Sequence, residues 1–99
     1  MEKGPLDIIS QKDPELFKNV TEAGKYAYAD GALSGKHKLL IAIALDAAQG
    51  AENGVKSLAM QAMKAGATKE EILESVRVAY YICGVGCVYT AANGLKDII

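Results

Sequence analysis

The chain has 99 residues, with 11 Lys and Arg against 12 Asp and Glu, and a net charge of −1. This balance, with no basic cluster interleaved with aromatic residues, argues against nucleic acid as a partner. The longest apolar run, Leu39–Leu45, is far shorter than the roughly 20 residues that a membrane-spanning helix needs, which argues against a membrane as well.

Small residues dominate the hydrophobic half of the chain. Hydrophobic residues make up 51% of it, but Phe17 is the only phenylalanine and tryptophan is absent. Small side chains let helices approach closely but bury little area each, and burial stabilises by roughly 25 cal/mol per Å². A core of this kind is marginal in a lone chain of this length. We therefore predict a homo-oligomer with helices at its interface.

The cysteine content and the first residues predict a cytoplasmic protein. Two cysteines are too few for a secreted disulfide framework, and in a reducing compartment they are expected to be thiols. Met1–Ile9 carries charges and has no long apolar run, so it does not have the pattern of a signal peptide.

The first third of the chain predicts one helix after a short lead-in, Met1–Gln11. Asp13 is a typical N-cap, and Pro14 is favoured at the first helical position. The apolar residues that follow share one helical face: Leu16, Phe17, Val20, Ala23, Gly24 and Ala27. The helix is predicted to span Pro14–Ala29 and to end at Asp30-Gly31.

A central helical hairpin is predicted within Lys36–Thr68. Its first helix, around Leu39–Ala48, is apolar on nearly every side apart from Asp46, so it belongs at the centre of a fold or in an interface. Its second helix, around Glu52–Ala65, is amphipathic, and Gly66 ends it.

The last third predicts one long helix. Thr68 and Glu71 have the spacing of a capping box, and Ser34 is the corresponding N-cap at the start of the hairpin. The residues predicted to point inward are Ile72, Leu73, Val76, Val78, Ala79 and Ile82. The glycines within Cys83–Cys87 can kink the helix, which resumes through Val88, Ala91, Ala92 and Leu95. No strand pattern persists, so we predict one all-α domain, residues 1–99, of about four to five helices.

Four segments stand in a characteristic order: Lys38–Ala44, Ala62–Thr68, Glu70–Ile72 and Ala79–Tyr81 with Gly84. This order resembles the carboxymuconolactone decarboxylase and AhpD-like (alkylhydroperoxidase) superfamily. The resemblance implies an all-helical subunit that assembles into dimers, trimers or hexamers. It also implies a site between helices near the subunit interface.

The catalytic residues of the AhpD-like and decarboxylase branches are absent from the matching positions of this sequence. The AhpD-like branch has a C-x-x-C pair at the start of the second hairpin helix, a histidine four residues later and a glutamate in the preceding helix. Counted back from Gly66, the thiols fall on Ala51 and Gly54, the histidine on Leu58 and the glutamate on Leu39. The histidine of the decarboxylase branch falls on the same leucine. Neither mechanism carries over residue by residue.

Cys83 and Cys87 are the strongest candidates for chemistry. Their i, i+4 spacing places both sulfurs on one helical face. A disulfide at this spacing is strained on an intact helix, but Gly84 and Gly86 can relax the backbone, and strained disulfides are the readily reduced kind. The alternative interpretation is that both are small buried hydrophobes.

Five other side chains are candidates for supporting roles. His37 is the only histidine, so any imidazole base must be this residue, although a solvated surface histidine is the commoner case. Glu52 and Lys56 form an i, i+4 pair beside the emptied thiol position, as a surface ion pair or as substrate-binding groups. Tyr80 is a candidate to donate its phenol to a substrate, although an amphipathic aromatic residue at an interface is the commoner case. Asp46 either pairs with Lys56 or caps a helix across an interface.

Three functional hypotheses follow. The first is a thiol-dependent oxidoreductase of peroxiredoxin type, resembling the AhpD-like branch, in which Cys83 and Cys87 reduce a peroxide or disulfide and a dithiol carrier supplies electrons. The second is a lyase for a small carboxylated lactone, with His37 and Lys56 as its base and cation. The third is a non-catalytic oligomer. We expect no cofactor, because zinc needs four ligands and one chain offers two thiols and a distant histidine; two chains could combine four thiolates.

Overall fold

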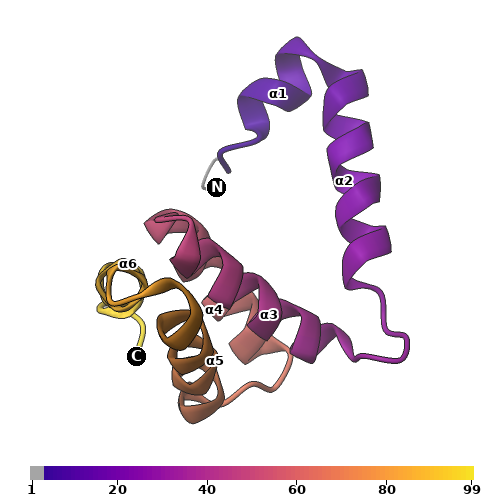
Figure 1. The fold of residues 1–99 in the computed structure, drawn as a ribbon. Coiled ribbons are helices and arrows are strands. Elements are labelled where there is room, and N and C mark those ends of the chain that lie inside the picture. Colours follow the sequence, from indigo (N-terminus) through magenta and orange to yellow (C-terminus); the bar gives the residue numbers. More distant parts are fainter. Residues whose placement is uncertain (1–3) are drawn as a thin grey trace.

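The computed structural model describes residues 4–99, and all regular structure in that range is helical. The six helices are α1 (Asp7–Lys12), α2 (Pro14–Tyr28), α3 (Gly35–Ala48), α4 (Glu52–Lys64), α5 (Lys69–Cys83) and α6 (Gly86–Leu95) (Figure 1). The all-α prediction is confirmed. The predicted four to five helices were too few, because the lead-in contains α1 and the last helix is divided in two. No helix of the described chain is both long and apolar enough to cross a membrane.

The helices form two parts (Figure 1). α3 to α6 pack together, and we call them the body. Residues 4–30, which contain α1 and α2, stand away from the body and are called the arm. In the described structure α1 contacts α2, α2 contacts α3 as well, and neither arm helix has a buried residue.

α3 lies at the centre of the body, as predicted from the apolar residues on nearly every side of this helix. It packs against α4, α5 and α6. Its buried residues recur at i, i+4 spacing: Leu39, Ile43 and Ala47. Ile41 and Leu45 lie on the outer side and are 48% and 59% exposed. The remaining core comes from the other body helices and from Ala67 in the connection between α4 and α5. The helical residues are Val55, Ala59, Ala62, Ile72, Val76, Ala79, Cys87, Ala91 and Leu95.

The predicted helix starts are confirmed in atomic detail. Asp13 Oδ1 accepts the Leu16 N–H at 3.0 Å at the start of α2. Ser34 caps α3, and Thr68 with Glu71 forms a reciprocal capping box on α5, with N···O distances of 3.1 and 2.8 Å.

α5 buries a narrower face than predicted. Its buried residues are Ile72, Val76 and Ala79. Three residues predicted to point inward are 45%, 63% and 72% exposed: Leu73, Val78 and Ile82. A single stripe of a helix contacts its neighbours, and apolar residues outside that stripe remain at the surface.

Candidate functional site

The long helix predicted for the last third is interrupted at the cysteine pair. α5 ends at Cys83, Gly84 has a φ of 100°, and α6 begins at Gly86. The Gly84 N–H donates to the Tyr80 carbonyl at 2.9 Å, and the Cys87 N–H donates to the Gly84 carbonyl at 3.2 Å. A positive φ of this kind favours glycine. The predicted kink is thus a complete break, which we call the thiol turn (Cys83–Cys87), and the strain expected on an intact helix does not apply.

The two thiols differ in exposure. Both are free; Cys83 is exposed, and Cys87 is 3% exposed. Burial raises the pKa of the Cys87 thiol above its ordinary value of 9.0, and the neighbouring Cys83 raises this pKa further. Cys87 is therefore a protonated thiol at neutral pH, and Cys83 is the sulfur that a molecule in solution can reach.

Apolar and aromatic side chains flank the thiol turn. The exposed ones are Tyr80, Tyr81, Ile82, Val85, Val88 and Tyr89. No charged residue occurs anywhere in residues 80–89. Tyr80 is three residues before Cys83, so its half-exposed side chain lies one turn away on the same helix. The exposed Cys83 thiol thus lies within a segment, residues 80–89, whose own side chains are uncharged and largely apolar.

The structure does not bring His37 to the thiols. Lys36 Nζ donates to Glu71 Oε2 at 3.0 Å, which holds the first turn of α3 against the first turn of α5. Cys83 is at the other end of α5, about 18 Å further along its axis at 1.5 Å per residue. His37 is exposed at the start of α3, and its Nδ1 is hydrogen-bonded to Ser34 Oγ at 2.8 Å.

Glu52 and Lys56 also lie outside the thiol turn. Glu52 Oε2 accepts a hydrogen bond from Asn93 Nδ2 of α6 at 2.8 Å. Among the described residues, Lys56 forms no salt bridge with Glu52, and its side chain lines a slot between α4 and the arm. The surface ion pair that the spacing favoured is therefore absent here.

The base and the cation of the lyase hypothesis are not adjacent. Asp46 on α3 lies against Gly54, two residues before Lys56. Asp46 is nine residues beyond His37, about 13 Å along α3 at the usual helical rise. His37 and Lys56 therefore sit at different levels of the α3–α4 hairpin.

Inert residues and a carboxylate occupy the positions to which the AhpD-like resemblance assigns two thiols and a glutamate. Ala51 precedes α4, and Leu39 is in the core. A Cβ added at Gly54 would collide with Asp46 Oδ2, so the carboxylate fills the space that a cysteine there would need. Sequence reasoning singled out Asp46 as the one charge in an apolar helix, but it proposed a partner on Lys56 or across an interface.

The body thus consists of the α3–α4 hairpin with α5 and α6 packed against it, which is an all-α fold. Residues 14–97 match the model of the carboxymuconolactone decarboxylase family, and the chain belongs to that family.

The chain is also similar to two individual proteins. It is 33% identical to apo-lpg0406, a carboxymuconolactone decarboxylase family protein from Legionella pneumophila, whose crystal structure superposes with a TM-score of 0.86 over 92% of this chain and 81% of that one. It is also 26% identical over 93 residues to the uncharacterized protein MJ1511 of Methanocaldococcus jannaschii, covering 94% of this chain and 87% of that protein.

Proposed function

We propose that this protein is a dithiol oxidoreductase that uses Cys83 and Cys87 in place of the usual thiol pair of its family. The observation that supports this is the thiol turn, which joins an exposed thiol to a buried, protonated one across a short break between two helices. An accessible attacking sulfur beside a sheltered resolving sulfur is the arrangement that a two-step thiol reaction needs.

The exposed sulfur begins the reaction. The Cys83 thiolate attacks an oxygen of a hydroperoxide, the O–O bond breaks, and the alkoxide or hydroxide takes a proton and leaves as an alcohol or water. Cys83 becomes a sulfenic acid. The Cys87 thiol then attacks that sulfur, the S–S bond forms, and water leaves. An external dithiol reduces the disulfide by exchange and is itself oxidised.

A partner disulfide fits the same residues. Cys83 would attack one of its sulfurs, and Cys87 would then release the partner as a dithiol. The exposed apolar and aromatic side chains of residues 80–89 favour an apolar organic hydroperoxide or the face of a protein. The Tyr80 phenol, one turn away, would donate a hydrogen bond to the departing oxygen. The reaction needs no cofactor, and we place it in a reducing cytoplasm with a dithiol carrier as electron donor.

The test follows thiol state in the reduced full-length chain. After one equivalent of cumene hydroperoxide, free thiols are trapped with iodoacetamide over time and mapped by mass spectrometry. We expect conversion to a Cys83–Cys87 disulfide that dithiothreitol reverses. Cys87→Ser should stop at a sulfenic acid on Cys83 that dimedone captures, and Cys83→Ser should not react. His37→Ala is the control and should keep the wild-type rate.

A non-catalytic oligomer is the second candidate, favoured by the Asp46 carboxylate against Gly54. Thiols that stay unmodified, or react only after denaturation, would support this candidate and contradict the first. Lactone turnover that survives replacement of both cysteines would instead support the lyase hypothesis.

A further inference from the structure

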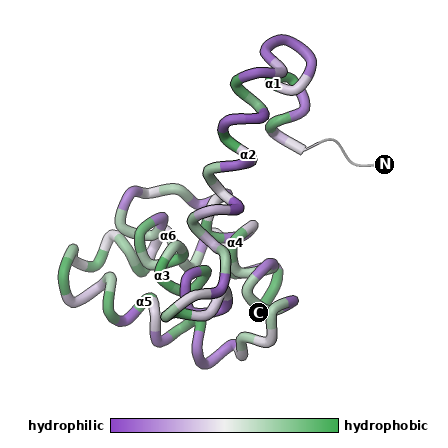
Figure 2. Tube along the Cα trace, turned by 90° about the vertical axis from the view of Figure 1, so that its right-hand side faces the viewer, coloured by the Kyte–Doolittle hydropathy of each residue, from purple (hydrophilic) through white to green (hydrophobic). Residues whose placement is uncertain are grey.

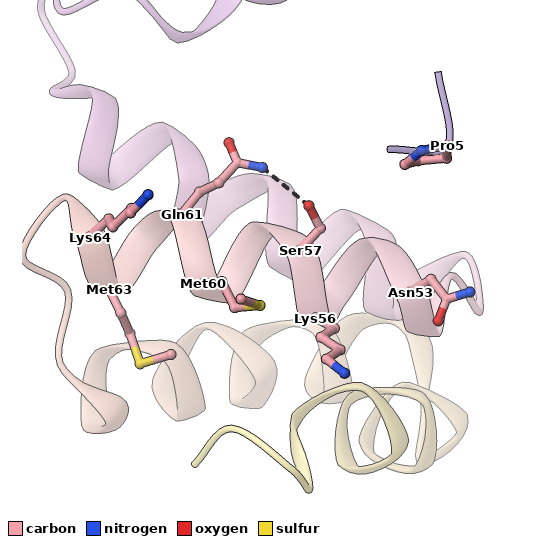
Figure 3. Close-up of a pocket in the computed structure, with 8 residues that line it drawn as sticks. All are labelled: Pro5, Asn53, Lys56, Ser57, Met60, Gln61, Met63 and Lys64. Carbon is pink, nitrogen blue, oxygen red and sulfur yellow. Dashed lines mark hydrogen bonds between the residues drawn. The ribbon is translucent and has the colours of Figure 1, made fainter. Parts of the chain in front are cut away.

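Two cavities in the described structure differ in their chemistry and in their place in the fold. The larger is the slot beside α4, of about 1040 Å³, whose lining includes Lys56 and Lys64 (Figure 3). The smaller, of about 300 Å³, lies between α5 and α6, the two helices that the thiol turn joins, and we call it the α5–α6 groove. Six aliphatic residues form its walls: Leu73 and Val76 of α5, and Val88, Ala91, Ala92 and Leu95 of α6.

The α5–α6 groove suits an uncharged, apolar ligand. Lys96, directly after α6, carries the one charged side chain among the described residues that line it. A lysine packs its alkyl stem on an apolar surface and keeps its ammonium group in water. The volume is at the lower end of the range for small-molecule sites. In the described chain the arm, which stands clear of the body in Figure 2, contacts neither α5 nor α6, so it does not cover the groove.

The groove-lining faces of both helices lead to the thiol turn. Cys87 is four residues before Ala91 and eight before Leu95, so these three residues share one face of α6. On α5, Cys83 is seven residues beyond Val76, which is about two helical turns along one face and about 10 Å at the usual helical rise. A chain molecule that lies in the groove can therefore point one end toward the two sulfurs.

The thiol turn and its neighbours add aromatic side chains and no charge. Tyr80, Tyr81 and Tyr89 are exposed, and residues 80–89 contain no charged residue. Aromatic side chains pack on planar rings in offset stacks or edge to face. A substrate that fits here is apolar, planar at its reactive end, and uncharged both before and after it takes two electrons from the thiols. A quinone meets these conditions, because its two-electron product, a hydroquinone, is uncharged as well.

We propose that the α5–α6 groove binds the alkyl tail of a substituted para-benzoquinone, whose ring is reduced to the hydroquinone at Cys83. This inference rests on the dithiol role of Cys83 and Cys87 proposed above, and it names the oxidant. Between Cys87 and Lys96, α6 offers the tail about 13 Å at the usual helical rise. A quinone has no leaving group to stabilise, which matches a segment, residues 80–89, without a charged residue or an imidazole.

The electrons and protons balance over the two thiols. Cys83 loses its proton to water, and its thiolate adds to a ring carbon of the quinone. A C–S bond forms, and an electron pair moves to a carbonyl oxygen, which takes a proton. The Cys87 thiol then loses its proton and attacks the Cys83 sulfur. The S–S bond forms, the C–S bond breaks, and the ring keeps the electron pair while its second oxygen takes a proton. Quinone and two thiols thus become hydroquinone and a disulfide, which the external dithiol reduces again.

Anaerobic oxidation of the reduced full-length chain tests the inference. Decylubiquinone is the probe, because its ring has no free position for a permanent thiol adduct and its tail is a simple alkyl chain. We expect a Cys83–Cys87 disulfide by mass spectrometry and an equal amount of hydroquinone by ultraviolet absorbance, both absent in Cys83→Ser and in Cys87→Ser. A disulfide with cumene hydroperoxide but none with decylubiquinone would overturn this inference and leave the proposed function intact. No disulfide with either oxidant would overturn both.

A pair of variants on α5 tests the groove separately. Leu73 lines the groove and is 45% exposed, whereas Val78 is not among its lining residues, is 63% exposed and is nearer in sequence to Cys83. Leu73→Glu should slow the reduction of decylubiquinone on the order of 10-fold, because its carboxylate must lose water when the tail binds.

Oxidation of Leu73→Glu by hydrogen peroxide, which needs no apolar site, should keep the wild-type rate. The matched control, Val78→Glu, should leave the rates with both oxidants unchanged. An unchanged quinone rate for Leu73→Glu, or equal slowing by Val78→Glu, would overturn the groove as the binding site.

Discussion

The arm and the body are made of equally regular helices but differ in what stabilises them. α2 and α4 have 15 and 13 residues, and each is amphipathic. α4 buries Val55, Ala59 and Ala62, whereas no residue of α2 is fully buried in the part of the chain that the structure describes. A cap and a 3.6-residue period therefore specify a helix without specifying what covers it. In the body, helices of the same chain pack against one another. For the arm, we propose that a second copy of the chain, in the homo-oligomer predicted from the sequence, supplies the packing.

The largest expected effect is in the body. Ile43→Ala removes a fully buried side chain of α3 and should lower the free energy of unfolding by about 2–5 kcal/mol. Urea unfolding followed by circular dichroism should give this loss at every protein concentration, because the contacts are within one chain.

Leu16→Ala is the corresponding substitution in the arm, to be compared with Ile43→Ala in the body. Its effect should be smaller and should vanish on dilution, where the arm is uncovered in the wild type as well. An equal, concentration-independent loss for both variants would mean that the arm is stabilised within its own chain.

Gly54 in the body and Gly24 in the arm differ in the space around them. Gly54→Ala brings a Cβ onto the Asp46 carboxylate and should destabilise by about 1–3 kcal/mol, as overpacking does. Asp46→Ala in the same chain should recover most of that loss. Failure of this double-mutant cycle to show coupling would contradict the contact.

Gly24→Ala is the same substitution in the arm, and it should have the opposite sign. A Cβ there meets nothing within 4 Å, and alanine is favoured over glycine inside a helix by roughly 0.5–1 kcal/mol. Hydrogen exchange of α2 amides should slow. Faster exchange would indicate that the position needs glycine for close contact with a partner.

Local signals made most of the fold predictable. Asp13, Ser34 and Thr68 each lie next to the backbone groups that they cap, so sequence alone identifies those helix starts. α1 was missed because it is short and no side-chain hydrogen bond caps its start. The break after Cys83 was predicted only as a kink, since Gly84 permits a positive φ without requiring one.

The site was less predictable, because its residues are related through tertiary contacts. The cysteine pair was proposed as a site from its spacing within five residues, and that proposal awaits its test. The place of His37 depends on a bond between Lys36 and Glu71, which are 35 positions apart, and no local pattern reveals it. The contact of Asp46 with Gly54 depends likewise on how α3 and α4 pack.

Thr68 and Asp13 cap helices in the body and in the arm, respectively. Thr68→Ala should lower global stability by about 1 kcal/mol, measured by urea unfolding, because α5 is part of the body. Asp13→Ala removes a similar cap from α2 and should act locally, as faster amide exchange in the arm at unchanged body stability when the chain is dilute. A global loss of the same size for Asp13→Ala would place the arm and body in one folding unit.

The smallest expected effect is a pH dependence in the body. The Thr68 N–H, and then Lys36, lower the pKa of Glu71 below its ordinary value of 4.5. A carboxyl whose pKa is lower in the folded state adds stability above its unfolded value, and that stability is lost as the pH falls through the folded pKa. Glu71→Gln should therefore reduce the loss of stability on acidification below about pH 4.5. Glu70→Gln, on the adjacent position without these bonds, should leave the acid slope as in the wild type. Equal slopes for the wild type and both variants would mean that the tie between the first turns of α3 and α5 contributes nothing to acid stability, and that packing of the core alone holds them together.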